Sequence, residues 1–362
     1  MDNGPDNRVQ RTPRRKWGLG MFLIILGIAL LVYFKMVPGL GFFTAAGEGR
    51  DADIIINEKK IPAFSSADIT TSSTRIEFIP SDHYGLEICM PEEYDPQWKV
   101  EGNRLTVRQK TGNVHIVGFV FTTDRYYVKV YYPKGAGFDE IQLTASSGGI
   151  KLPETEVKKL TITTSSGNIN ANAVQFANAV VKASSGDINF TGRSANGQAE
   201  IKSNSGKVDA SANGCEQVKI TASSGKINAN VDGCSKVDIT ASSGDITVLS
   251  KDKKATNLTV RAKSGKIRVD GAAWSELYAE SSSGDIQVAG ALFGTTSVKA
   301  SSGRVELQVN GQASQYGYDL RASSGSIHWD GRKMEKSAHA SDSLDNLIKV
   351  NTSSGSIKVD FK

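Results

Sequence analysis

Beyond residue 141 the chain alternates between apolar and polar positions, and the alternation restarts after each of a series of Ser-Gly pairs. Two residues after the glycine stands Ile or Val, and four residues after it another apolar residue, as in the segment from Gly225 to Ala229. Val218 and Ile220 precede the same glycine by seven and five positions. Alternation at period two on both sides of a glycine predicts two strands per repeat, each with one buried side.

The Ser-Gly pair recurs at a nearly constant spacing. Successive glycines are 19, 19, 20, 19, 19, 21, 19, 19, 22 and 30 residues apart, which is typical of a solenoid or an array. The phase of the alternation slips at the glycine, so a bend must absorb one residue, and glycine accepts the positive φ that such a corner often needs. We therefore expect Gly225→Val to distort a corner. The corner glycines are Gly148, Gly167, Gly186, Gly206, Gly225, Gly244, Gly265, Gly284, Gly303, Gly325 and Gly355.

The repeat predicts an all-β protein, a parallel β-solenoid of about eleven 19–20-residue repeats over residues 141–362. Stacking at about 4.8 Å per repeat would place like side chains over like, so that Ile227 lies beside Ile246. An antiparallel array of hairpins or a β-sandwich is the alternative fold, but neither requires identical columns in every repeat.

Residues 51–140 lack the Ser-Gly signature yet also alternate, as in Arg75 to Ile79 and Tyr127 to Tyr131. The first rung of a solenoid exposes unpaired backbone, so we interpret this stretch as an N-terminal β cap that is continuous with the repeats. A separate small β domain is the alternative. The polar insert 335–345 within the last spacing predicts a loop that leaves the final rungs.

An apolar segment near the N-terminus predicts one transmembrane helix at residues 18–37. Residues 18–34 carry no charge, Trp17 and Tyr33 stand at the two ends of this segment, and basic residues are concentrated before it. The positive-inside rule then gives a cytoplasmic tail at 1–17, a linker at 38–50 and an extracellular remainder. A cleaved signal peptide is the alternative, because Thr44-Ala45-Ala46 offers small residues to a peptidase.

Composition narrows the classes of function. The 43 basic and 38 acidic residues give a formal charge of only +5, unlike the basic face that nucleic-acid binding requires. Three cysteines and four scattered histidines show no metal-ligand spacing, so we expect neither a metal nor a cofactor. Catalytic motifs such as H-E-x-x-H or a Walker sequence are absent from the sequence.

Two outward-facing columns accompany each corner. Directly after the glycines the charges change sign, as at Asp187, Lys207 and Asp245, so we expect opposite charges to pair between rungs rather than a calcium ladder. Four positions before the glycines runs a stripe rich in hydroxyls and cations, which is either a solvated strand face or a surface for a glycan or an anionic wall polymer. This candidate binding stripe comprises Thr144, Thr163, Lys182, Lys202, Thr221, Thr240, Arg261, Lys299 and Arg321.

Cys215 and Cys234 are 19 residues apart and each follows a glycine. They would occupy one column on adjacent rungs, with α-carbons about 5 Å apart, which is within the range of a disulfide. An oxidising compartment permits the bond. Two small buried thiols are the alternative, because stacked strands can aim both side chains in the same direction.

The repeated T-A-S-S-G-(D/K)-I, the segment from Tyr131 to Lys134 and the N-terminal anchor resemble the bacterial putative-adhesin family of β-strand-repeat domains of unknown function. The resemblance extends over about residues 51–362. It implies a membrane-tethered cell-envelope protein of Gram-positive type. The family pattern contains no catalytic residues that could be assigned to positions of this sequence. It also implies relatives encoded beside envelope stress-response systems.

These observations favour a non-enzymatic, membrane-anchored rod that contacts wall polymer, a glycan, an envelope partner protein or another surface. A polysaccharide-acting β-helix enzyme is the alternative from another class, but it would need clustered carboxylates, and Asp187, Asp245 and Asp285 are whole rungs apart. A third hypothesis is a sensor or regulator of envelope stress that acts through the short cytoplasmic tail.

Overall fold

The computed structural model describes residues 53–109, 125–252, 256–340 and 344–362. The predicted cytoplasmic tail, transmembrane anchor and linker, residues 1–50, lie outside these ranges. Within them, no helix has the length and the apolar character needed to span a bilayer.

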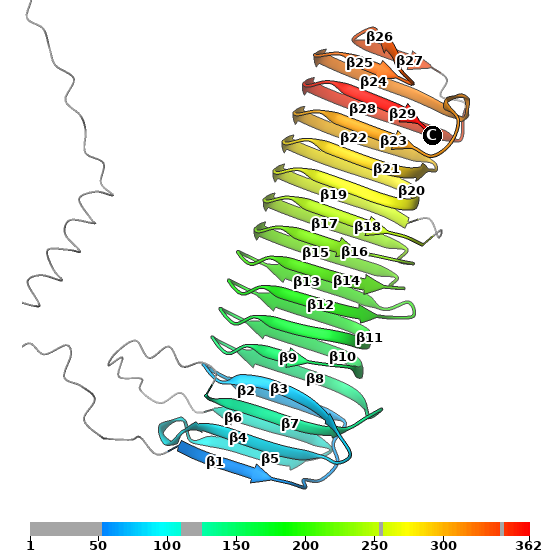
Figure 1. Ribbon diagram of the computed structural model, residues 1–362. Coiled ribbons are helices and arrows are strands. Elements are labelled where there is room, and N and C mark those ends of the chain that lie inside the picture. The colour runs from blue at the N-terminus through cyan, green and yellow to red at the C-terminus, as the bar shows by residue number, and fades with distance from the viewer. Residues whose placement is uncertain (1–52, 110–124, 253–255, 341–343) are drawn as a thin grey trace, which may run out of the picture. The chain divides into compact units, whose positions relative to one another are not determined.

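The described residues of the unit 52–362 form a stack of rungs, each made of two strands joined at the Ser-Gly corner (Figure 1). In β15 (Gln217–Ser224) the residues Val218 and Ile220 point inward, and in β16 (Ile227–Asn230) Ile227 does the same. Ile227 pairs in parallel register with Ile246, so the predicted stacking of like residues is confirmed. The antiparallel array and the sandwich are excluded as alternatives for the repeats.

Strands before the Ser-Gly corners form one face of the stack, called face A. Their spatial order is β5 (Pro96–Glu101), β6 (Arg104–Gln109), β2 (Ser66–Thr71), β8 (Gly137–Ala145), β10 (Thr155–Thr164), β11 (Ile169–Ala183), β13 (Gln198–Ser203), β15, β17 (Lys236–Ser243), β19 (Thr256–Ser264), β20 (Ile267–Ser283), β22 (Thr295–Ser302), β28 (Asn346–Ser354), β24 (Tyr316–Ser324) and β27 (Ser337–Ala340).

Strands after the corners form the opposite face, face B. Their order is β1 (Asp53–Glu58), β4 (Gly85–Pro91), β7 (Tyr127–Pro133), β3 (Arg75–Ser81), β9 (Ile150–Leu152), β11, β12 (Ile188–Arg193), β14 (Val208–Asn213), β16, β18 (Ile246–Ser250), β20, β21 (Ile286–Leu292), β23 (Val305–Val309), β29 (Ile357–Phe361), β25 (Ile327–Trp329) and β26 (Arg332–Met334). Two short 3₁₀ turns, η1 (Glu92–Tyr94) and η2 (Ala313–Gln315), lie in connections.

The two ends of the stack are closed by antiparallel strands. At the N-terminal end β5 pairs with β6, and β4 pairs with both β1 and β7, all antiparallel. At the other end β26 and β27 pair antiparallel with β25 and β24. The predicted boundary between cap and repeats at residue 141 falls inside β8, because the parallel stack already includes β2 and β3.

The last rung in the sequence is not the last rung in space. β28 pairs with β22 on one side and with β24 on the other, and β29 lies between β23 and β25 in the same way (Figure 1). The insert after residue 334 was expected to be a loop leaving the last rungs. It instead carries β27, which covers the edge of β24. We call residues 316–340, which form this end of the stack, the tip. The chain then returns, and β28 fills the position between the tip and β22.

Close stacking on the rung below requires glycine at every corner, and from Gly225 onward a positive φ requires it as well. At Gly225 the backbone has φ +138°, as the phase slip predicted. At Gly186 no positive φ occurs, but an added Cβ would lie 1.9 Å from the carbonyl oxygen of Gly167 in the rung below. In the first four copies, Gly148, Gly167, Gly186 and Gly206, close stacking of backbone on backbone is therefore what requires glycine, and the expectation of a positive φ there is wrong.

Candidate functional site

The predicted binding stripe forms one continuous row on the outside of face A. Because Ile220 and Ala222 point inward, Thr221 between them points outward, and the same holds in every rung. Thr221 is in register with Lys202 on one side and with Thr240 on the other. We call this row the outer ladder; its spatial order is Thr144, Thr163, Lys182, Lys202, Thr221, Thr240, Arg261, Glu280, Lys299, Asn351 and Arg321.

The outer ladder continues two rungs beyond its predicted start. Thr70 of β2 is in register with Thr144 and with Arg108 of β6. Thr70 was missed because Thr74 stands where the other rungs have the corner glycine, and Arg108 because the glycine four positions after it, Gly112, follows Thr111 and not a serine. The segment from Thr70 to Thr74, TTSST, nevertheless keeps the Thr and Ser positions of the repeat, and that similarity was the available signal.

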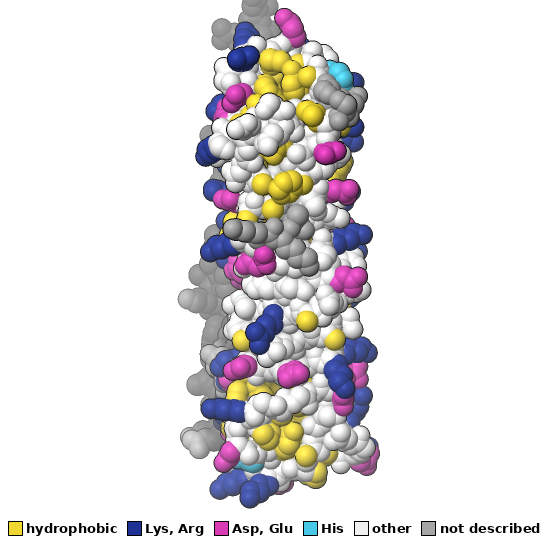
Figure 2. All heavy atoms as spheres, turned by 90° about the vertical axis from the view of Figure 1, so that its right-hand side faces the viewer, with side chains coloured by type: hydrophobic (Ala, Val, Ile, Leu, Met, Phe, Trp, Pro, Cys, Tyr) yellow, Lys and Arg dark blue, Asp and Glu magenta, His cyan; other side chains and the backbone are white. Residues whose placement is uncertain are grey.

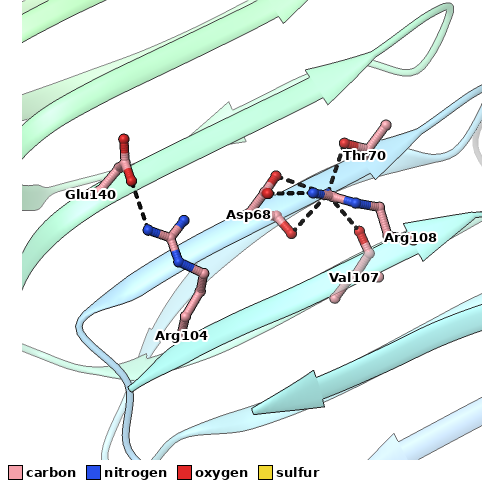
Figure 3. Close-up of polar contacts among 6 residues, drawn as sticks. All are labelled: Asp68, Thr70, Arg104, Val107, Arg108 and Glu140. Carbon is pink, nitrogen blue, oxygen red and sulfur yellow. Dashed lines mark hydrogen bonds and ion pairs between the residues drawn. The ribbon is translucent and has the colours of Figure 1, made fainter. Parts of the chain in front are cut away.

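The cations at this N-terminal end are neutralised by carboxylates. Arg108 donates from Nη1 to Asp68 Oδ1 at 2.8 Å and to Thr70 Oγ1 at 2.9 Å, and its Nη2 contacts the second carboxylate oxygen (Figure 3). These bonds to Asp68 raise the pKa of Arg108. Arg104 donates to Glu140 at 2.8 Å. This end of the ladder therefore presents paired charge.

Cations in the middle of the ladder are more available. Lys182 Nζ lies 3.7 Å from Glu200, and Lys202 makes no ion pair with any described residue. Arg261 lies 3.8 Å from Glu280, 3.9 Å from Asp238 and 4.9 Å above the ring centre of Tyr278. Exposed pairs at such lengths contribute little, so these side chains can turn toward a ligand.

The aspartates after the corners do not form the predicted ion pairs between rungs. Asp187 Oδ1 accepts the backbone N–H of Lys207 at 2.8 Å, and Asp245 accepts that of Lys266 at 2.9 Å. The side chain of Lys207 pairs at 2.6 Å with Asp209, two residues further along the chain and in the same rung. The carboxylates thus bridge successive backbones, and among the described residues no cluster of three His, Cys, Asp or Glu side chains is placed to hold a metal.

Cys215 and Cys234 lie on adjacent rungs, as Ser235 donates its backbone N–H to the Cys215 carbonyl at 3.0 Å. A hydrogen bond between the two thiols, together with burial, raises the pKa of Cys215. Both residues are free thiols in this structure. The disulfide therefore stays a prediction, which three reactive thiols per denatured chain would exclude.

A polar cluster on the outside of face B was not foreseen. Glu87 accepts hydrogen bonds from the hydroxyls of Tyr127, at 2.5 Å, and Tyr131, at 2.8 Å. The bond from Tyr127 lowers the pKa of Glu87, and the same bond raises the pKa of Tyr127 to about 12. The three residues come from two antiparallel cap strands, β4 and β7, whose register no repeat pattern reveals.

A groove of about 1070 Å³ lies at the second corner of the stack, where face B strands turn into face A strands. It crosses five successive rungs and is lined by residues within 137–139, 156–158, 175–178, 193–198 and 213–214. We call it the corner groove. Figure 2 shows this edge of the stack: charged side chains lie mostly along its two flanks, and uncharged side chains occupy much of the middle.

The chain matches the family model described as Toastrack DUF4097 over residues 64–271 and 250–360. Among solved structures, a putative adhesin from Bacteroides fragilis NCTC 9343 is 13% identical, with a TM-score of 0.26 and coverage of 85% of this chain and 97% of that one. A putative lipid binding protein from Parabacteroides distasonis ATCC 8503 is 15% identical, with a TM-score of 0.33 and coverage of 87% and 98%. At these TM-scores neither likeness carries an argument about function. No curated protein matches the chain.

The two segments of the family match extend from the first parallel rung at β2 to the rung of β29. They confirm the family resemblance that the Ser-Gly repeat indicated. The chain belongs to the Toastrack DUF4097 family.

Proposed function

We propose that this protein is a non-enzymatic binding rod of the cell envelope, anchored in the membrane by residues 18–37 with the stack outside the cell. In this proposal the outer ladder contacts an anionic wall polymer. The observation that carries it is the row of outward cations Lys182, Lys202, Arg261 and Lys299 on one face of the stack, at whole multiples of the rung spacing.

The regular spacing suits a repeating anion. Adjacent rungs are about 4.8 Å apart, so a chain of phosphate or carboxylate groups that runs along the stack meets a cation or a hydroxyl on each rung from Thr144 to Arg261, before the ladder reaches Glu280. Thr221 and Thr240, between the two groups of cations, supply hydroxyl donors. Electrostatic attraction of this kind weakens as salt is added.

The arrangement of carboxylates supports a binding role over the enzymatic alternative. A glycoside hydrolase needs two carboxyl groups across one bond, about 5 to 9.5 Å apart. Asp187, Asp245 and Asp285 each accept the backbone N–H of a residue in the next rung instead. Glu87 is held by two tyrosine hydroxyls.

Calorimetry with purified full chain in detergent and soluble poly(glycerol phosphate) tests the proposal. We expect Lys182→Ser/Lys202→Ser to weaken binding about 5- to 30-fold, from about 0.5–1 kcal/mol for each exposed ion pair. The matched control Lys226→Ser/Lys266→Ser removes the same charge beside the Ser-Gly corners. Equal loss in both variants, or no binding by the unmodified chain, would overturn the proposal.

A further inference from the structure

We propose that the corner groove binds an uncharged glycan strand that lies along the axis of the stack. This site is separate from the outer ladder and does not depend on the proposed function. It rests on the shape of the groove, on the chemistry of its lining and on its balance of charge.

The groove has a rigid wall because one rung is a residue longer than its neighbours. Glycines Gly186 and Gly206 are 20 apart, and the extra residue lies in the turn 194–197. Ser194 donates its backbone N–H to Asn213 at 2.9 Å and Asn196 donates to Gly214 at 3.2 Å. The turn is thus fixed to the rung above and stands beside the shorter corners below it.

The floor of the groove is a short apolar row. Phe138, Val157 and Phe176 are in register on three successive rungs. They are only 2%, 1% and 6% exposed. The core therefore closes the floor and leaves little apolar surface open to a ligand, so an acyl chain, which would need an extended apolar channel, is disfavoured, and a ligand in the groove would contact mainly its polar lining.

Carboxamide side chains dominate the polar part of the lining. Each one offers a donor and an acceptor, as a sugar hydroxyl does, so the two groups are matched in both roles. Asn213 donates to Ser211 Oγ at 3.2 Å, which holds this carboxamide in place, and its Oδ1 is buried, so it is not among the acceptors open to a ligand. The carboxamide residues are Gln175, Asn178, Asn196, Gln198 and Asn213.

The charges of the groove cancel. Asp139 and Lys158 form an ion pair at 2.8 Å, which leaves one carboxylate, Glu156, and one guanidinium, Arg193. An anionic polymer would meet two acids here and a cationic peptide two bases, so an uncharged ligand fits best.

A peptide strand is disfavoured for a second reason. The strands that border the groove, such as β10 and β11, are paired with neighbours on both sides, so no free edge is available to extend by β-augmentation. The groove instead crosses the strands. Four rung spacings give it a length of about 19 Å, which suits a linear oligosaccharide of several units.

The test measures binding of uncharged β-linked glucose and N-acetylglucosamine oligosaccharides, from two to six units, to the full chain by calorimetry. We expect affinity to rise with length until the groove is filled. Gln175→Ala/Asn178→Ala should weaken binding about 5- to 100-fold, because two hydrogen bonds are lost. The control Asn170→Ala/Asn189→Ala removes two exposed carboxamides from face B and should change nothing.

Three outcomes would overturn the inference: no binding of either oligosaccharide series, equal loss in the control, or displacement of the bound sugar by poly(glycerol phosphate). A melting temperature equal to that of the unmodified chain establishes that each variant is folded. The ladder variant Lys182→Ser/Lys202→Ser should bind the oligosaccharides normally. The experiments can therefore disprove glycan binding by the corner groove without affecting the proposal for the outer ladder, and they can disprove the ladder proposal without affecting the groove.

Discussion

At the scale of single residues, the contact between successive corners sets the tightest constraint. Gly148 and Gly149 are neighbours in sequence, yet an added Cβ would lie 2.0 Å from the Thr74 carbonyl oxygen at Gly148 and 3.6 Å from the nearest atom at Gly149. We expect Gly148→Ala to lower the free energy of unfolding by about 1–3 kcal/mol, as overpacking does.

Gly149→Ala is the matched control, because its Cβ would make only an ordinary van der Waals contact. Thermal unfolding followed by circular dichroism compares the two variants. Equal melting temperatures would show that the rungs can separate at this corner, contrary to the close stacking described above.

The Glu87 cluster predicts a dependence of stability on pH. The hydrogen bond from Tyr127 holds the pKa of Glu87 below its usual 4.5 in the folded state. The ionised carboxylate therefore stabilises the fold fully above about pH 4.5, and this contribution is lost as the pH falls through the lower folded-state pKa. We expect Glu87→Gln to cost about 1–2 kcal/mol at pH 7 and much less at pH 3.

Chemical denaturation of both proteins between pH 3 and pH 7 measures this difference. The exposed Glu93→Gln serves as the control and should shift stability by the same small amount at each pH. A cost for Glu87→Gln that does not change with pH would mean that the ionised form has no special partner in the fold.

At the scale of elements, the sequence predicts each rung but not the order of all rungs. Ile227 and Ile246 could be paired in advance because every repeat places Ile or Val at the same position. The same uniformity hides which rung lies beside which: Ile357 fits equally well above Val305 or above Ile327, and the structure places it between them. The intercalation is determined by the connections, which carry no periodic signal.

The cap strands illustrate the second limit of prediction. The rung of β2 and β3 has Thr74 at the corner instead of glycine, so the Ser-Gly search misses this rung and the strand β6 beyond it. The antiparallel strands β4 and β7 alternate like any other strand, and alternation alone does not specify a partner or a direction. The Glu87 cluster depends on that pairing, so it could not be predicted from the sequence.

The intercalated rung predicts an unusual response to truncation. Among the described strands, β24 pairs only with β28 and β27, and Trp329 of β25 packs against Phe361 with ring centres 4.9 Å apart. Ending the chain at residue 345 removes this support, so we expect residues 316–340 to lose amide protection in hydrogen exchange.

Ending the chain at residue 310 instead removes the tip together with its support. Protection should then persist through β23, even though more of the chain is missing. Strong protection of residues 316–340 in the chain that ends at residue 345 would show that β24 docks directly on β22. It would contradict the need for the intercalated rung.

At the scale of the whole molecule, the two candidate sites differ in how much of each can be predicted from the sequence. The outer ladder follows from the repeat, because a fixed offset from each glycine selects one outward row. The corner groove depends on where the repeat is broken: a single extra residue between Gly186 and Gly206 raises one turn above its neighbours. The spacing of 20 residues in place of 19 can be read from the sequence. The sequence does not reveal that the extra residue forms a turn that borders a groove.

The length of the ladder predicts avidity, if the ladder acts as proposed. Lys182 and Lys202 form one group of cations, and Arg261 and Lys299, with Glu280 between them, form another. Lys182 and Lys299 are six rungs apart, about 29 Å. A poly(glycerol phosphate) chain that is long enough reaches both groups at once, and its second contact is then intramolecular, with an effective concentration in the millimolar range.

We therefore expect Arg261→Ser/Lys299→Ser to weaken binding of long polymer at least tenfold but to weaken binding of fragments of two or three units only about twofold, because a short fragment still has the other group. Calorimetry with size-fractionated polymer measures both, and Lys226→Ser/Lys266→Ser controls for net charge. Long and short chains that lose affinity by the same factor would show that the two groups act separately, and the stack would then be a carrier of independent sites rather than one extended surface.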